Sequence, residues 1–314
     1  MPALRPRCVM ELPCSYPKKP LTSSVTLDRS NATFLNSLDS PDLLPYLNLR
    51  NQNWTSVSGI FVAEGPLLVE RFIQSDYSVR SALLDQKYLD HYADQIPDEV
   101  KLLVVPHDLV QQIVGFNFHR GLLACGIRKP INSVAQVATQ LPAQQTWLGL
   151  VGVQDPENVG GMLRTAAGLG IQNVVIGPGT ADPLSRRSLR VSMGQALKLN
   201  LYLSRDLPAD LQLLKRRGVE CLATSLGDSS QPLERAHRHG PVLLLMGNER
   251  HGLPKELLVH CDRQVRIDMS MQVDSLNVGV AAGIVMHHFC RIATLSGSLG
   301  AISPVESLAG TSVR

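Results

Sequence analysis

The feature of this chain that most constrains its fold is an alternation of short apolar runs with amphipathic segments. Between residues 147 and 295, the runs WLGLVGV, NVVIG, VECLATSL and PVLLLMG are separated by segments whose apolar residues follow helical spacing. Apolar runs without regular polar alternation are typical of strands in a parallel sheet that helices cover on both faces. We therefore predict an α/β domain with a parallel sheet, ending in a long helix from Leu276 into Ile292.

A shorter alternation of the same kind precedes this region. Its strand-like runs are GIFVAEG, VRSALLD, VKLLVVP and GLLACGI, and the segments between them have helical periodicity, which predicts a smaller α/β unit. The two alternations are separated by small and polar residues typical of a linker, and we expect both chain ends to be poorly ordered. The predicted divisions are a leader at 1–45, a first domain at 46–128, a linker at 129–146, a second domain at 147–295 and a tail at 296–314.

The composition narrows the possible functions. The net charge is only +3 with 18% charged residues, so nucleic-acid binding would depend on local patches rather than on overall charge. The six cysteines are scattered without a C-x-x-C pair, so we expect reduced thiols, no metal site and a cytoplasmic location.

The longest apolar stretch, Val278 to Met286, is too short to span a bilayer. The N-terminus lacks the apolar run of a secretory signal, and we interpret it as a disordered leader rather than a transit peptide.

The segment DPENVGGMLRTAAGLG, residues 155–170, follows an apolar run and predicts a turn leading into a helix. This arrangement is typical of phosphate cradles, but both G-x-G-x-x-G and G-x-x-x-x-G-K-[ST] are missing, which excludes a Rossmann-type dehydrogenase. Helical periodicity places Arg164 opposite the apolar face, between Gly161 and Gly168. Arg164 could be an ordinary solvated arginine, or the costly glycines could allow close approach of a backbone or a ligand.

Two further segments combine glycines with polar side chains. In LLLMGNERHGLP, a buried strand runs into Gly247, whose backbone could approach a ligand, and Glu249 follows. In RIDMSMQVDSLNVGVAAGIVMHH, a strand is predicted to end at Ile267, Ser275 lies at the predicted helix N-cap, and Asn277 lies in the first helical turn. Solvated charges in an ordinary turn and a well-capped core helix remain the alternative interpretations.

Together the three segments resemble the signature motifs of the SpoU (TrmH-type) RNA 2′-O-ribose methyltransferases of the SPOUT superfamily. The family patterns are N-x-G-x-x-x-R, G-x-E-x-x-G and I-P-M-x-x-x-x-x-S-L-N-V. The matching residues are Asn158, Gly160 and Arg164, then Gly247, Glu249 and Gly252, then Ile267, Met269, Ser275, Leu276, Asn277 and Val278. Asp268 departs from the pattern, since the family usually has proline there. FVAEGPLLVERFI and HRGLLA resemble the ribosomal-protein-like substrate-binding domain of the same family.

This resemblance implies a deep trefoil knot in the second domain, an RNA-binding first domain and a homodimer. It implies that S-adenosylmethionine is bound by Gly247, Ile267, Leu276, Thr224 and Met269. The implied catalytic residues are Arg164, Asn158, Glu249, Ser275 and Asn277. Arg164 could act as a general base or as a clamp for phosphate and hydroxyl groups. We favour the clamp because a guanidinium with a pKa above about 12 is rarely neutral.

The implied substrate is structured RNA, with ribosomal RNA favoured over transfer RNA. Arg186, Arg187 and Arg190 form one basic cluster, and Lys215 to Arg217 form another. Either cluster could contact phosphates or be a solvated helix end. The alternative function is a non-catalytic RNA-binding or ribosome-assembly protein that retains the fold. The intact set of motif residues favours the enzyme.

Overall fold

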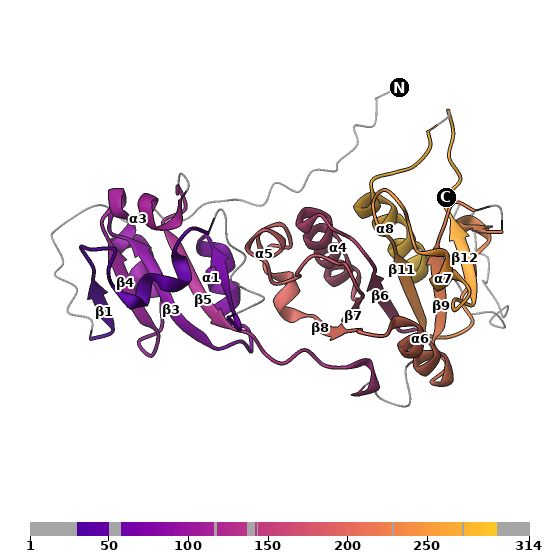
Figure 1. Ribbon diagram of the computed structural model, residues 1–314, viewed down its shortest axis with the longest axis horizontal. Coiled ribbons are helices and arrows are strands. Elements are labelled where there is room, and N and C mark those ends of the chain that lie inside the picture. Colours follow the sequence, from indigo (N-terminus) through magenta and orange to yellow (C-terminus); the bar gives the residue numbers. More distant parts are fainter. Residues whose placement is uncertain are drawn as a thin grey trace, which may run out of the picture. The chain divides into compact units, whose positions relative to one another are not determined.

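The computed structural model describes residues 30–49, 58–115, 118–136, 142, 144–227, 229–271 and 273–293 (Figure 1). The predicted tail at 296–314 and most of the predicted leader lie outside these residues. The strands form two sheets, one from each of the two alternations found in the sequence.

The first sheet has the strand order β1-β4-β3-β5-β2. Its strands are β1 (Ala32–Phe34), β2 (Ile60–Glu64), β3 (Val79–Asp85), β4 (Lys101–Val105) and β5 (Leu122–Ile127). β1, β4 and β3 are parallel, whereas β5 is antiparallel to both β3 and β2. The connecting elements are the 3-10 helix η1 (Pro41–Tyr46), α1 (Pro66–Ile73), η2 (Gln86–Tyr88), α2 (Leu89–Tyr92), η3 (Ala93–Gln95) and α3 (His107–Val114).

The second sheet is entirely parallel, as the apolar runs predict, and has the order β10-β12-β9-β11-β6-β7-β8. Its strands are β6 (Thr146–Leu150), β7 (Asn173–Ile176), β8 (Asn200–Leu203), β9 (Glu220–Thr224), β10 (Gln231–Pro232), β11 (Val242–Met246) and β12 (Arg263–Arg266). β6 and β11 lie side by side near its centre, and their side chains are buried throughout.

Helices cover this sheet. They are η4 (Val134–Gln136), α4 (Pro156–Leu169), α5 (Arg186–Val191), η5 (Gln195–Lys198), α6 (Leu207–Arg216), η6 (Leu233–Arg235), α7 (Lys255–Leu258), α8 (Val278–His287) and the π-helical turn η7 (His288–Ile292). α4 packs against both α5 and α8. Gly160 is essential to the contact between α4 and α5, because a Cβ there would lie 2.6 Å from the carbonyl oxygen of Ser188.

A buried arginine connects the C-terminal helix to the start of the central strand. Arg238, only 1% exposed, donates hydrogen bonds to the carbonyl oxygens of Gln145 (2.8 Å) and Phe289 (3.0 Å). Its Nε donates to the carbonyl oxygen of Gly240 at 3.1 Å. The planar guanidinium therefore satisfies backbone acceptors from three separate segments.

Two expectations from the sequence are wrong in detail. The predicted leader extends too far, because β1 pairs with β4 and the η1 residues Leu43 and Tyr46 are fully buried. The spacing of apolar residues from Leu184 to Leu197 predicts a single helix, but the structure interrupts it between α5 and η5. Met193 and Gly194 there adopt φ values of 53° and 78°, which no helix accommodates.

Candidate active site

The three motifs meet at one edge of the parallel sheet. β6 and β11 pair with Leu150 opposite Met246, so the motif segments that begin after these residues leave the sheet at the same edge. β12, which precedes the third motif, is parallel to β9, which in turn is parallel to β11. Ligand sites in open α/β sheets lie at the carboxyl ends of the strands, so this edge is the candidate active site.

Glu249 of the second motif is bound to the first motif through its carboxylate. Its Oε1 accepts hydrogen bonds from the backbone N–H of Asp155 (3.2 Å) and from the side chain of Asn158 (3.0 Å). Its Oε2 accepts from the backbone N–H of Gln154 at 3.2 Å. Three donors from the end of the β6–α4 loop and the first turn of α4 thus hold the glutamate, although it lies at an exposed position.

Asn158 extends this connection to the third motif. While its Nδ2 donates to Glu249, its Oδ1 accepts a hydrogen bond of 3.1 Å from the Nδ2 of Asn277. Asn277 also caps α8, because its Oδ1 accepts from the backbone N–H groups of Gly279 (2.8 Å) and Val280 (3.3 Å). We call this chain of Glu249, Asn158 and Asn277 the motif relay.

Ser275 does not have the capping role that its position in the sequence suggests. The N-cap of α8 is Asn277, and α8 begins at Val278. Ser275 is exposed in the loop before it. Asn277 suits the cap position because its amide oxygen accepts from the helix while its amide nitrogen donates to Asn158.

Gly247 also differs from its expected environment. A Cβ on Gly247 would lie 2.3 Å from the carbonyl carbon of Gly252 and 2.4 Å from the nitrogen of Leu253. The missing side chain therefore makes room for the protein's own loop rather than for a ligand. Backbone hydrogen bonds of 3.0 and 2.9 Å between Asn248 and Gly252 close this loop.

Arg164 is exposed on α4, on the side away from the core, as predicted. A Cβ on either flanking glycine, Gly161 or Gly168, would meet no atom within 4 Å, so the space around Arg164 is open. Among the described residues, no hydrogen bond or ion pair joins Arg164 to Asn158 or Glu249. The motif relay orders the loops but does not orient the arginine.

The expected cofactor residues lie around the same strand ends. Ile267 and Met269 follow β12, Leu276 precedes α8, and all three are half-buried. Thr224 ends β9, and its hydroxyl donates to the carbonyl oxygen of Leu245 at 2.9 Å. Thr224 thus braces two adjacent strands at the point where their loops diverge.

The basic clusters are largely engaged within the chain. Arg186 forms an ion pair with Glu64, and Arg187 forms one with Glu157 at 2.8 Å. In the second cluster, Lys215 pairs with Asp262 at 2.8 Å. Arg217 donates to the carbonyl oxygens of Val134 (3.2 Å) and Ala135 (2.9 Å), and the Nε of Arg216 donates to the carbonyl oxygen of Gln212 in its own helix at 3.4 Å. Only Arg190 in the first cluster has no such bond to another described residue.

Comparison with known proteins identifies the family. The family model described as the SpoU rRNA methylase family matches residues 145–287. A protein from Mycobacterium bovis named an uncharacterized tRNA/rRNA methyltransferase is 36% identical over 265 residues, covering 82% of this chain and 86% of that protein. This chain belongs to the SpoU rRNA methylase family. The motif relay described above therefore joins the three signature motifs of a SpoU protein.

Other SpoU relatives agree with this assignment. A 23S rRNA (guanosine-2′-O-)-methyltransferase from Acinetobacter baylyi is 30% identical and covers 62% of this chain and 80% of its own length. The crystal structure of an rRNA methyltransferase from Sinorhizobium meliloti matches with a TM-score of 0.71 at 23% identity, covering 83% of this chain and 98% of that one. At that identity the match shows a shared fold.

Two features are absent from the part of the chain that the structure describes. No group of three or more His, Cys, Asp or Glu side chains there could hold a metal ion. No helix there is long and apolar enough to cross a membrane.

The first prediction concerns the double role of Asn277. Asn277→Ala removes the helix cap and the donor to Asn158, and should lower the free energy of unfolding by about 1–2 kcal/mol. Asn277→Asp keeps an acceptor for the cap but loses the donor, so it should restore only part of this stability. Urea unfolding of the three proteins measures the difference. Full recovery in Asn277→Asp would mean that the bond to Asn158 contributes nothing.

The second prediction concerns the pH dependence of the motif relay. Burial acts to raise the pKa of Glu249, but the hydrogen bonds from Asn158 and from backbone N–H groups outweigh it and lower the pKa below the ordinary 4.5. The stabilisation from a lowered pKa is fully present above the ordinary value and is lost as the pH falls through the lowered one.

Wild-type protein should therefore lose thermal stability on acidification below pH about 4.5 more steeply than Glu249→Gln. Thermal unfolding followed by circular dichroism between neutral and acidic pH measures this. Glu256→Gln, on the exposed side of α7, is the matched control and should follow the wild type. Equal acid sensitivity of Glu249→Gln and wild type would contradict the assigned role.

Proposed function

We propose that this protein is an S-adenosylmethionine-dependent RNA methyltransferase that methylates a ribose 2′-hydroxyl of ribosomal RNA. The observation that carries the proposal is the motif relay, which joins all three SpoU motifs at the carboxyl edge of a parallel sheet. Relatives in this family are named 23S rRNA (guanosine-2′-O-)-methyltransferases, and a solved structure of the same fold contains the cofactor.

The cofactor would occupy the strand ends at this edge. The half-buried apolar side chains of Ile267, Met269 and Leu276 suit an adenine ring and a methionine chain, and backbone groups of the Gly247 loop complete the site. Thr224 would form one wall of the cofactor site, and its hydrogen bond to Leu245 holds it in position. When bound, the cofactor supplies a methyl group on a positively charged sulfur.

The residues of this chain would then position the RNA. Arg164, with open space around it, acts as a clamp that holds a phosphate and orients the ribose hydroxyl for in-line attack. A neutral guanidine is too rare to serve as an efficient base. Ser275 is exposed in the loop before α8 and contacts the substrate ribose, while Asn158, Glu249 and Asn277 hold the loops in place.

The active form would be a homodimer. α8 exposes Val280 (54%) and Ile284 (40%) one turn apart, so the two form an apolar stripe on a helix that already packs against α4. Two copies packed through α4 and α8 would bring the Arg164 side of one to the other.

The remaining features of the family are part of the proposal. The first domain, 46–128, binds RNA, and 129–146 links it to the methyltransferase domain at 147–295. The segment after β12 forms a trefoil knot. The bond from Asn277 to Asn158 brings this segment back to α4, as a knotted segment requires.

The third prediction tests the clamp. Arg164→Ala should leave the free energy of unfolding within about 0.5 kcal/mol of wild type, because the residue is exposed. Binding of S-adenosylmethionine, measured by calorimetry, should also persist. Methyl transfer to ribosomal RNA transcribed in vitro should fall by about a hundredfold or more, since the clamp acts on the transition state.

Arg164→Lys should restore little transfer, because an ammonium lacks the planar fork of a guanidinium. Arg205→Ala, another exposed arginine, is the matched control and should retain full activity. Near wild-type turnover in Arg164→Ala would show that the residue is not catalytic. A wild-type protein that neither binds the cofactor nor methylates RNA would instead favour a non-catalytic RNA-binding protein.

The fourth prediction tests the homodimer. Ile284→Glu places a carboxylate in the apolar stripe of α8 and should shift sedimentation at micromolar concentration from dimer to monomer. Val259→Glu introduces the same charge at a position that is 79% exposed after α7, and should leave the dimer intact. A wild-type protein that sediments as a monomer would contradict the proposed assembly.

A further inference from the structure

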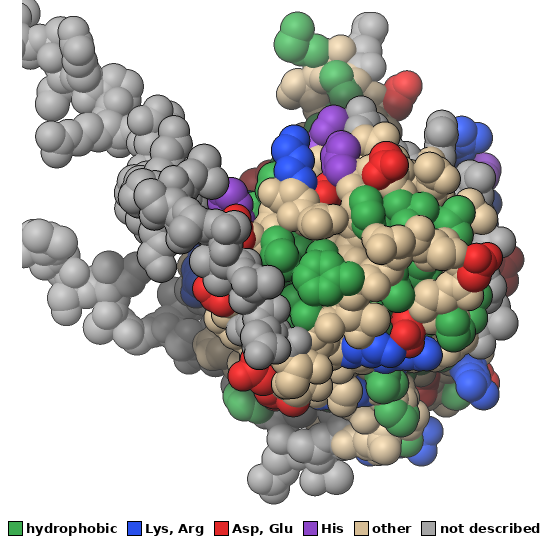
Figure 2. Space-filling model, turned by 90° about the vertical axis from the view of Figure 1, so that its left-hand side faces the viewer, with side chains coloured by type: hydrophobic (Ala, Val, Ile, Leu, Met, Phe, Trp, Pro, Cys, Tyr) green, Lys and Arg blue, Asp and Glu red, His purple; other side chains and the backbone are tan. Residues whose placement is uncertain are grey.

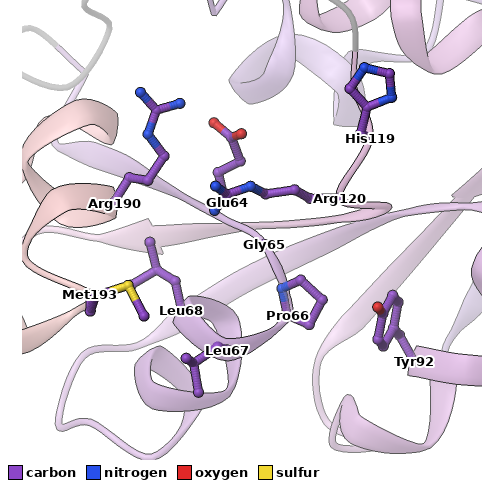
Figure 3. A pocket seen from close by; sticks show the side chains of 10 residues that line it. All are labelled: Glu64, Gly65, Pro66, Leu67, Leu68, Tyr92, His119, Arg120, Arg190 and Met193. Atoms are coloured by element: carbon purple, nitrogen blue, oxygen red, sulfur yellow. The ribbon is translucent and has the colours of Figure 1, made fainter. Parts of the chain in front are cut away.

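A pocket of about 410 Å³ lies apart from the three motifs. The turn from β2 into α1 forms its floor, Tyr92 and the loop before β5 form one side, and α5 forms the other (Figure 3). Its residues belong to one compact unit, Asn31–Arg314. The volume falls within the range of about 300–1,000 Å³ that small-molecule sites occupy.

The pocket has an excess of positive charge. Arg120 and Arg190 both line it, and neither forms a hydrogen bond or an ion pair with another residue in the described part of the chain. Glu64 also lines the pocket, but it is only 5% exposed and is neutralised by its ion pair with Arg186. Two uncompensated guanidinium groups facing one cavity favour an anion, and phosphate matches their planar fork.

Gly65 fixes how Arg120 crosses this pocket. The residue has a φ of 99°, and a Cβ there would lie 3.0 Å from the Cδ of Arg120. The bare glycine lets the arginine stem lie directly over the turn, which directs the stem across the floor (Figure 3). The stem of Arg120 therefore lies close to the turn, beside the other residues of the floor.

Next to the cations is an aromatic and apolar surface. Tyr92 lines the pocket and stacks on Tyr88, with ring centroids 5.9 Å apart and an interplanar angle of 30°. Pro66 and Leu67 add apolar surface on the floor. Unpaired RNA bases are bound in this way, by aromatic faces beside cationic side chains that hold the backbone.

We propose that this pocket binds one unpaired nucleotide of the RNA substrate, separate from the nucleotide that is methylated. Arg120 and Arg190 hold the phosphates on either side of it, and its base lies against Tyr92 and Pro66. The inference rests on the proposed function and adds a second contact through which the enzyme selects its RNA. Among the described residues on the face shown in Figure 2, lysines and arginines are scattered between apolar patches.

The test compares charge-matched double variants of the full-length protein. Arg120→Gln/Arg190→Gln removes both pocket cations, and Arg80→Gln/Arg205→Gln removes two exposed arginines elsewhere. The probes are a fluorescein-labelled single-stranded 12-nucleotide RNA of uridines and an abasic chain of the same length. Fluorescence polarisation at several KCl concentrations gives the affinity and its salt dependence.

The pocket variant should bind the RNA about tenfold more weakly, and its slope of log affinity against log salt should be smaller by about 1.4, for two lost phosphate contacts. The control variant should stay within about twofold of wild type. Tyr92→Leu should keep the salt slope but lose the preference for uridine RNA over the abasic chain. If the double variant does not fold by circular dichroism, Arg120→Gln and Arg190→Gln singly should each lower the slope by about 0.7.

Equal affinity and slope in the pocket and control variants would overturn the inference. Displacement of the RNA by a polyglutamate peptide, with no difference between normal and abasic RNA, would assign the pocket to an acidic peptide and would also overturn it. Methyl transfer to ribosomal RNA separates this result from the proposed function. If the wild type transfers methyl groups and the pocket variant has the same KM for RNA, the pocket proposal is refuted and the proposed function stands. If the wild type transfers no methyl groups, the proposed function is refuted, and the RNA-binding measurements still test the pocket proposal.

Discussion

The side-chain amide of Asn158 is the interaction on which the rest of the site depends. Its two ends are used at once, the nitrogen donating to Glu249 and the oxygen accepting from Asn277. Only an amide of this length offers a donor and an acceptor on one short, rigid group. Asn277 is in turn the cap of α8, so a change at Asn158 would reach both the second-motif loop and the C-terminal helix.

The parallel sheet makes this connection possible. β6 and β11 are neighbours in the sheet although the second lies far along the chain, and parallel pairing places their carboxyl ends together. Two glycines then allow the close approaches that the loops need. Gly160 lets α5 pack on α4, and Gly247 lets its loop fold back onto Gly252. Both glycines allow close packing between segments of the chain itself. This packing places the loops so that the residues of the motif relay lie within hydrogen-bond distance.

The positively charged side chains of this protein fall into two groups, those bound to other groups within the chain and those proposed to bind RNA. Most arginines and lysines of the two basic clusters are held by carboxylates or carbonyl groups within the chain. Arg190 is the exception in these clusters, and the proposals use it together with Arg164 at the sheet edge and Arg120 in the pocket. A protein with a net charge of only +3 can bind RNA in this way if individual cations lie where phosphates approach.

The sequence by itself determined most strands of both sheets, the parallel direction of the second sheet and the family, because apolar runs and three spaced motifs are local signals, whereas the edge strands β8 and β10 were not predicted. The first sheet's edge strand β1 escaped prediction, since its stability comes from pairing with β4 rather than from its own composition. The tertiary structure alone decided that Asn277 rather than Ser275 caps α8, that Gly247 packs against its own loop, and that Arg186 forms an ion pair with Glu64. In each case the interacting group lies far away in the sequence, or its position depends on the exact path of a loop. Hydrogen bonds and ion pairs require short distances in space, which the sequence pattern does not give.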